Sequence, residues 1–228
     1  NNTQKFSSTK NNGAEVTVAC VLKSGGDFTV DYVFRLQNMV RRNTTVPHKF
    51  MCLSDLNIDS SICESIKFSH DYGGWWSKIE LFRPGLVRTE FVLYLDLDSV
   101  IVGNVDDLLL SKCEFVALKP WNPENLANGL IASGMMAWKN DGTYAFICQQ
   151  FRSQDISYYP KGDQEYISIM LKSMNKYPPV FFQDRIKGIY SYKKNCQQGL
   201  PEDARVICFH GKPRPNEVSD EWVKKNWT

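Results

Sequence analysis

The chain has 228 residues, 43% of them hydrophobic and 13% aromatic, which is enough for the core of one large α/β domain. Its formal net charge of +2 excludes a nucleic-acid-binding protein held by a strongly basic surface. No stretch approaches the roughly 20 consecutive apolar residues of a membrane-spanning helix, so we expect no membrane span in this chain.

Residues 1–12 are rich in Asn, Ser and Lys, and we predict that they form a disordered lead-in to a single domain over residues 13–228. The apolar run Val16–Leu22 predicts the first strand of that domain. A glycine-containing loop follows, and apolar residues at helical spacing then predict a helix over about residues 29–42. The next predicted elements are strands at residues 49–53 and 66–68 and a helix at residues 75–82.

Two carboxylates follow an apolar strand near the middle of the chain. Phe91–Leu95 is a continuous apolar run, as is typical of a buried central strand, and Asp96 and Asp98 come directly after it. Open α/β sheets place their ligands just beyond the carboxyl ends of such strands. We therefore predict that Asp96 and Asp98 are oxygen ligands for Mn²⁺ or Mg²⁺, a metal that could in turn hold a diphosphate. An isolated Asp-x-Asp arises by chance about once in a chain like this, so the prediction depends on context.

Strands and helices continue to alternate toward the C-terminus. The predicted strands are at residues 115–118, 134–138 and 205–209, and the predicted helices are at about residues 143–151 and 164–174. This alternation predicts a mostly parallel central sheet that is covered by helices on both faces.

A second polar segment follows the last predicted strand. His210 precedes Gly211, which lets the backbone turn sharply, and an imidazole beside two carboxylates suits Mn²⁺ better than Ca²⁺. The alternative is a histidine that is hydrogen-bonded at a strand end. Lys212 and Arg214 would neutralise a diphosphate and a developing anionic leaving group, unless they form a solvated basic loop.

The loop after the first strand is not a dinucleotide or P-loop fingerprint, because residues 23–30 contain neither G-x-G-x-x-G nor G-K-[ST]. It could still bind a nucleotide base and ribose, with Tyr32 stacking on the base and Asp27 accepting a hydrogen bond from a hydroxyl. The alternative for Tyr32 is packing within the helix that carries it.

Two further segments carry polar residues beside aromatic or glycine residues. Trp75 and Trp76 are adjacent, so one indole can pack in the core while the other lines a cleft, and Lys78 then faces either diphosphate or water. Asp163 begins a predicted helix, where it fits an N-cap as well as a sugar-facing carboxylate.

Together these segments resemble the metal-dependent, A-type glycosyltransferase fold, most closely the glycogenin-like and galactosyltransferase-like group that uses UDP-sugars and small transferases of bacteria and large DNA viruses. The resemblance extends from about Val16 to Trp227. It implies an α/β domain with a mostly parallel central sheet flanked by helices. It also implies a Rossmann-like nucleotide-binding half at about residues 13–103 and a donor-sugar and acceptor half at about residues 104–228.

The resemblance also implies roles for individual residues. Tyr94–Asp98 is similar to the D-x-D element of that group and Phe209–Pro213 to its C-terminal histidine segment, so Asp96, Asp98 and His210 would hold Mn²⁺ and Lys212 would contact the diphosphate. The implied nucleotide pocket contains Leu22, Lys23, Asp27, Tyr32 and Leu97. The implied donor-sugar site contains Lys78, Ser133, Gly134, Asp163, Gln164 and Gly211. The Gly25-Gly26 loop and the Pro213-Arg214-Pro215 ending depart from the pattern of the group.

We therefore predict an enzyme that moves a sugar from a UDP-sugar to a glycan or glycoprotein acceptor, with Mn²⁺ as the cofactor and Mg²⁺ as a substitute. Lys78 and Lys212 would stabilise the departing diphosphate in the transition state. The resemblance implies retention of the anomeric configuration, in which the leaving phosphate takes the acceptor proton. If the configuration inverts instead, Asp163 is the candidate base.

Two alternatives remain at this point. Asp96-Leu97-Asp98-Ser99-Val100 also resembles the D-x-D-x-[TV] element of haloacid-dehalogenase-like phosphatases, in which the first aspartate is a Mg²⁺-dependent nucleophile. Against it, residues 166–168 contain no second aspartate and the segment 210–215 stays unexplained. The other alternative is a nucleotide-sugar-binding domain without turnover.

The seven cysteines are an odd number, they lack C-x-x-C spacing, and several lie inside apolar runs as buried small hydrophobic residues do. This pattern predicts a reducing compartment, and we expect a cytoplasmic protein. Because the chain begins at Asn1, the alternative is a lumenal catalytic domain whose anchor has been removed, as one domain of a longer protein.

Overall fold

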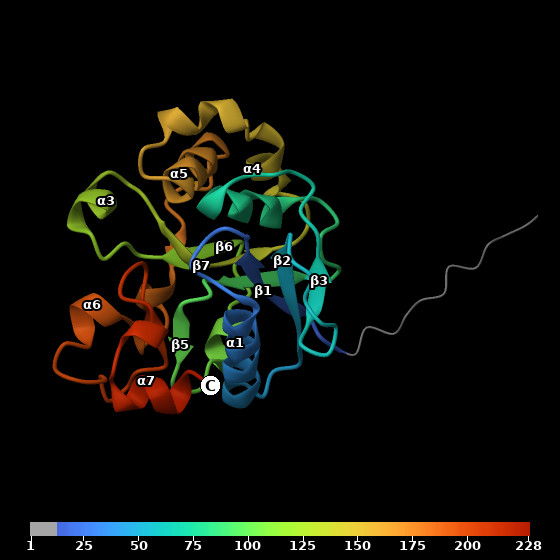
Figure 1. Ribbon diagram of the computed structural model, residues 1–228. Coiled ribbons are helices and arrows are strands. Elements are labelled where there is room, and N and C mark those ends of the chain that lie inside the picture. Colours follow the sequence, from blue (N-terminus) through green and yellow to red (C-terminus); the bar gives the residue numbers. More distant parts are fainter. Residues whose placement is uncertain (1–12) are drawn as a thin grey trace, which may run out of the picture.

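A central sheet of seven strands in the order β3-β2-β1-β4-β7-β6-β8 organises the protein (Figure 1). The computed structural model describes residues 13–228, so the predicted lead-in at residues 1–12 lies outside the described residues. The strands are β1 (Val16–Leu22), β2 (His48–Ser54), β3 (Glu64–Ile66), β4 (Phe91–Leu95), β6 (Phe115–Leu118), β7 (Ala132–Lys139) and β8 (Val180–Phe181). Only the two pairings of β7 are antiparallel, so the predicted mostly parallel sheet is confirmed.

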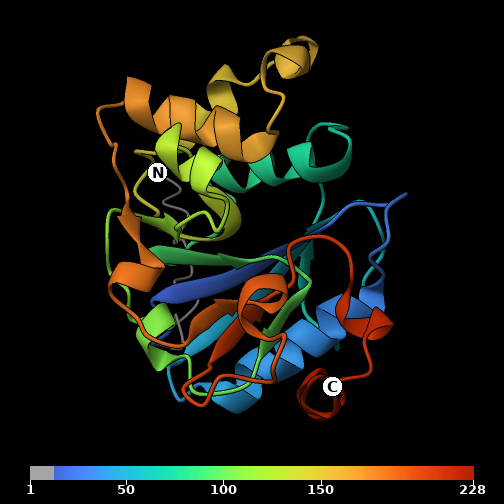
Figure 2. The ribbon, with the colours of Figure 1, turned by 90° about the vertical axis from the view of Figure 1, so that its left-hand side faces the viewer.

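Helices cover both faces of this sheet, as Figure 2 shows. The α-helices are α1 (Val30–Asn43), α2 (Asp106–Leu109), α3 (Pro123–Ala127), α4 (Ala145–Gln150), α5 (Asp163–Ser173), α6 (Tyr192–Asn195) and α7 (Glu221–Asn226). The 3-10 segments are η1 (Gly74–Phe82), η2 (Ser153–Tyr158), η3 (Phe182–Asp184) and η4 (Pro215–Glu217). In Figure 1, η1, α4 and α5 lie above the sheet, whereas α1 and α7 lie below it. The predicted helix at residues 75–82 corresponds to η1, which is a 3-10 helix and not an α-helix.

Two hydrophobic cores result, one on each face of the sheet. Alternate residues of a strand point to opposite faces. Accordingly, Leu93 and Leu95 of β4 pack with α1, whereas Val92 and Tyr94 pack with η1, α4 and α5. A strand that is buried on both faces reads as a continuous apolar run, which is why β4 was recognisable in the sequence.

A second, smaller sheet contains β5 (Ser99–Ile101), β10 (Val206–Cys208) and β9 (Ile189–Ser191), in the order β5-β10-β9. β5 begins directly after Asp98, and β10 ends two residues before His210. The two strands are antiparallel, with Ser99 opposite Cys208. This pairing brings the two predicted metal-binding segments to the same end of the small sheet.

The cysteines and the helices concern two predictions, a reducing compartment and the absence of a membrane span. All seven cysteines carry free thiols, including Cys20 and Cys52, which lie opposite each other on β1 and β2. Within residues 13–228, every helix is too short or too polar to cross a bilayer. The compartment itself stays a prediction.

Candidate active site

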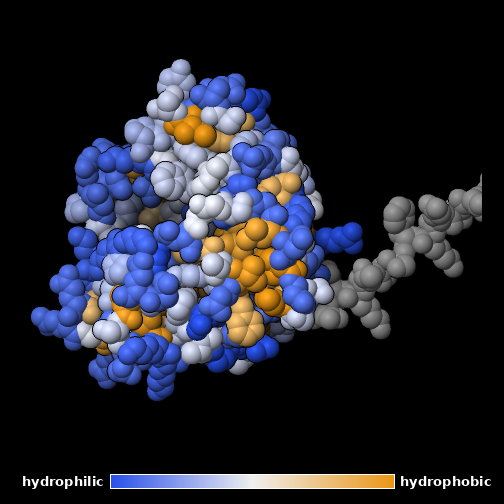
Figure 3. All heavy atoms as spheres, viewed as in Figure 1, coloured by the Kyte–Doolittle hydropathy of each residue, from blue (hydrophilic) through white to orange (hydrophobic). Residues whose placement is uncertain are grey.

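A cleft of about 1020 Å³ opens where β1 and β4 end. Figure 3 shows the hollow between the surface over α3 and the surface over α6. A cleft of this size is comparable to the sites of cofactors and other small molecules. The predicted site residues that line it are Lys23, Asp27, Lys78, Asp96, Leu97, Asp98, Ser133, Gly134, Asp163, Gln164, His210 and Gly211. The structure thus brings together residues from six separate segments of the sequence.

Lys78 lies at the centre of the cleft floor. Its buried Nζ is 3.2 Å from Oδ1 of Asp96 and 3.3 Å from Oδ2 of Asp163, and it donates to Oγ of Ser133 at 3.2 Å. Burial alone would lower the pKa of Lys78, but the carboxylates of Asp163 and Asp96 raise it above the ordinary value. Lys78 is therefore a fixed positive charge inside the cleft.

Asp163 is the first residue of α5, and its carboxylate contacts Ser133 and Lys78. Oγ of Ser133 donates to Oδ2 of Asp163 at 2.6 Å, on the same side as Lys78. The N-cap position belongs to Gly162, so the N-cap interpretation of Asp163 is wrong. Its carboxylate is instead part of the cleft floor.

Asp96 is held between a phenol and an ammonium group. The hydroxyl of Tyr94 donates to Oδ1 of Asp96, the same oxygen that faces Lys78. A Cβ atom on Gly134 would lie 3.0 Å from Oδ2 of Asp96, so glycine allows β7 to approach this carboxylate closely. The backbone N–H of Asp96 also donates to the carbonyl of Gly134 at 2.8 Å. These contacts fix the carboxylate at the end of β4.

Asp98 is more deeply buried, with 3% of its surface exposed, and pairs with an arginine from the C-terminal segment. Nη1 of Arg214 lies 2.5 Å from Oδ2 of Asp98. The guanidinium also stacks over Phe28 at 4.4 Å and has Nη2 3.6 Å from Oδ2 of Asp27. Burial and the nearby Asp96 raise the pKa of Asp98 to about 6, and Arg214 offsets this only in part.

His210 lies across the cleft in a left-handed backbone conformation, with φ of 38°. Its Nε2 is 2.6 Å from Oγ of Ser191, and its ring stacks on Trp121 with the ring centres 5.2 Å apart. Partial burial and the ammonium of Lys193 lower the pKa of His210 below 6.5, so the imidazole is neutral at pH 7. A neutral imidazole is the form that binds a metal.

The predicted metal ligands suit Mn²⁺ in their chemistry, since two carboxylates and a neutral imidazole line one cleft. Within residues 13–228, however, no group of three or more His, Cys, Asp or Glu side chains is arranged to hold a metal ion. Lys78 and Arg214 neutralise the two carboxylates instead, and Ser191 bonds the imidazole. Metal binding by Asp96, Asp98 and His210 therefore stays a prediction.

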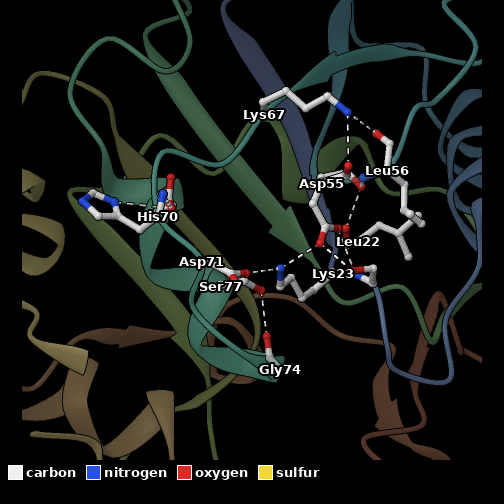
Figure 4. A network of polar contacts seen from close by, with 12 residues as sticks. Leu22, Lys23, Asp55, Leu56, Lys67, His70, Asp71, Gly74 and Ser77 are labelled. Atoms are coloured by element: carbon white, nitrogen blue, oxygen red, sulfur yellow. Dashed lines mark hydrogen bonds and ion pairs between the residues drawn. The ribbon is translucent and has the colours of Figure 1, made fainter. Parts of the chain in front are cut away.

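The first loop is anchored by an aspartate that the sequence analysis did not assign to the site. Oδ2 of Asp55 accepts from Nζ of Lys23 at 2.7 Å, and Asp71 accepts from the same ammonium at 2.7 Å (Figure 4). Ser24 donates to Asp55 through both its N–H and its hydroxyl. Although burial opposes the shift, these donors lower the pKa of Asp55. Asp55 directly follows β2, as Asp96 follows β4, so the same position at the end of a strand could have identified it.

Three predicted site residues lie outside the cleft lining. Leu22 is fully buried in the core. Tyr32 is 4% exposed and donates to Oδ1 of Asn216 at 2.7 Å, which agrees with the packing alternative. Lys212 is exposed and pairs with Glu217 at 2.5 Å. Their proposed contacts with nucleotide or diphosphate stay predictions.

Comparisons with known proteins place this geometry in a structural context. The sequence matches no family model and no curated protein sequence. The glycosyltransferase GlyE of Streptococcus pneumoniae TIGR4 superposes with a TM-score of 0.60 at 15% identity, over 94% of this chain and 61% of the GlyE chain. The present chain thus spans less than two thirds of GlyE.

Two structures of LgtC match over nearly their whole length. The galactosyltransferase LgtC in complex with donor and acceptor sugar analogues gives a TM-score of 0.61 at 11% identity, over 93% of this chain and 96% of LgtC. An active-site mutant of LgtC superposes with a TM-score of 0.63 at 11% identity, over 92% of this chain and 93% of the LgtC chain. The predicted α/β fold class is therefore confirmed, and the chain shares its fold with these glycosyltransferases.

Proposed function

We propose that this protein is a glycosyltransferase that moves a sugar from a UDP-sugar to a glycan or glycoprotein acceptor. The observation that carries the proposal is the cleft itself. With the exceptions of Leu22, Tyr32 and Lys212, the residues predicted for a nucleotide-sugar site converge on it. The fold shared with glycosyltransferases supports the same conclusion, and nothing in the cleft favours the phosphatase alternative.

In this proposal Asp96, Asp98 and His210 would hold Mn²⁺, or Mg²⁺ in its place. When bound, the cation would act as a Lewis acid on the leaving diphosphate. Arg214 supplies the counter-charge that buried Asp98 needs, and it lines the same cleft, so its guanidinium is also available to a diphosphate.

The residues of the cleft floor have distinct tasks in the transfer. Lys78 offers a preorganised positive charge to the oxygen that departs with UDP, where negative charge develops in the transition state. Asp96 and Asp163 hold that ammonium, and Ser133 fixes the orientation of Asp163. For a retaining reaction the leaving phosphate takes the acceptor proton, and Asp163 positions the donor sugar.

The proposal is tested by measuring thermal stability with UDP alone, Mn²⁺ alone and both together. A ligand that binds only the folded state raises stability according to its occupancy. We expect the large shift to need both components, and UDP-sugars then to be screened for UDP release. A shift with fluoroberyllate and Mg²⁺ but none with UDP would favour the phosphatase. Tight UDP-sugar binding without UDP release or transfer would favour a non-catalytic binding domain.

Replacing His210 by alanine is expected to weaken Mn²⁺ binding about tenfold and Mg²⁺ binding much less, because Mg²⁺ prefers an all-oxygen shell. Titration calorimetry of each cation in the presence of UDP measures the two affinities. His70→Ala is the control, since His70 lies outside the cleft and faces Glu80 at 3.5 Å. Equal losses for both cations would show that His210 is structural.

A further inference from the structure

Trp75 is an exposed aromatic side chain in the lining of the cleft. It lines the cleft with 63% of its surface exposed, whereas its neighbour Trp76 is 6% exposed and stacks on Phe151 in the core. One indole of the pair thus contributes to folding. The other presents a flat apolar surface to the cleft.

The indole lies against a glycine. Gly162 has φ of 78°, and a Cβ atom there would lie 2.8 Å from Nε1 of Trp75. The ring therefore lies against backbone that only glycine leaves open. Gly162 directly precedes Asp163, and Trp75 lies three residues before Lys78 on η1. Trp75 is thus close to the cleft floor in two ways, through Gly162 next to Asp163 and through its own segment η1, which carries Lys78.

The surroundings of Trp75 match the two kinds of surface on a sugar ring. A pyranose has an apolar face of C–H groups that can stack on an aromatic ring, and hydroxyl groups around its edge. Lys161 and Asn125 line the same cleft and can bond such hydroxyls. Trp121 also lines the cleft, but its ring is already stacked on His210.

We propose that Trp75 is the platform for a pyranose ring of the acceptor, which makes the acceptor a carbohydrate. This inference rests on the proposed function. The donor sugar belongs beside Lys78, Ser133 and Asp163, which are all buried. Trp75 is exposed and lies next to them, on the path by which an acceptor hydroxyl reaches the floor from solvent.

Fluorine NMR of protein labelled with 5-fluorotryptophan tests the contact directly. The chain has six tryptophans, so the spectrum contains few signals and a shift of one of them can be followed. The Trp75 signal is identified by its loss in Trp75→Phe. UDP and Mg²⁺ are added first, and lactose, maltose and chitobiose are then titrated separately. We expect at least one disaccharide to shift the Trp75 signal saturably while the Trp222 signal stays unchanged. A Trp75 signal that no disaccharide moves, or that moves only with a UDP-sugar, would overturn the proposal.

Kinetics separate this inference from the proposed function. Trp75→Ala is expected to raise KM for the saccharide acceptor at least tenfold, while Trp75→Phe restores most of the loss. Tyr158→Ala is the matched control, because Tyr158 is exposed but does not line the cleft. If the wild type transfers sugar and Trp75→Ala keeps its KM, the platform alone is disproved. If the wild type releases no UDP from any UDP-sugar, both proposals fail.

Discussion

Replacing Lys78 by methionine is expected to lower the free energy of unfolding by about 3 kcal/mol and kcat by at least about 100-fold. The stability loss follows because Asp96 and Asp163 would remain in the cleft floor without the ammonium between them. The loss in kcat follows because a fixed charge near the departing diphosphate acts most strongly in the transition state. UDP affinity is expected to change less than turnover.

Urea unfolding at pH 7.5 and the rate of UDP release measure the two effects of Lys78→Met. Lys194→Met is the control for stability, since Lys194 lines the same cleft but is exposed. The pKa of Lys78 is raised, so its contribution to stability is fully present below the ordinary value of 10.5 and is lost only at higher pH. Unchanged unfolding at pH 7.5 would contradict the charge arrangement described for the cleft floor.

Replacing Asp98 by asparagine is expected to abolish the thermal shift that needs both UDP and Mn²⁺, with cation affinity falling at least about 100-fold. The substitution keeps the shape of the side chain and removes the charged oxygen ligand. Asp107→Asn is a matched control, because Asp107 also forms an Asp–Arg pair, at 2.6 Å from Arg205, but lies outside the cleft lining. Unchanged Mn²⁺ affinity in Asp98→Asn would exclude the proposed metal site.

The pKa of Asp98 adds a pH dependence with a defined sign. The folded-state pKa of about 6 exceeds the ordinary 3.8, so the contribution of Asp98 to stability is fully present below pH 3.8. It is lost as the pH rises through about 6, by about 3 kcal/mol in total. The unfolding free energy of the wild type should therefore fall relative to Asp98→Asn over this range. Protons also compete with the cation, so Mn²⁺-dependent UDP binding should weaken below about pH 6.

The longer strands were predictable because burial on both faces leaves a continuous apolar run. β1 and β4 begin and end where the sequence predicts. Most of the shortest elements were not predictable, because two or three residues carry no periodicity, although β10 lies within the predicted strand at residues 205–209. β8 and β9 were missed for this reason, and β3 lies at Glu64–Ile66, where it pairs with β2, instead of at residues 66–68.

The location of the cleft was predictable from the rule that ligands bind at the carboxyl ends of parallel strands. The pairing of Arg214 with Asp98 was not, since the two residues are 116 positions apart and only the folded chain brings them together. Tyr32 is a different case, because helical spacing places it on the same face of α1 as Leu36 and Val40. That spacing favoured the core over the nucleotide pocket.

The antiparallel pairing of β5 with β10 has a consequence for the order of folding. The pairing of Ser99 with Cys208 closes a loop that contains the whole intervening chain, and closing so long a loop carries an entropic penalty that local elements do not have. The sheet they form has strands of only three residues, whereas the strands around β1 are longer and packed on both faces. We therefore expect the proposed catalytic centre to form late in folding and to open early on heating, so that activity disappears while the large sheet is still intact.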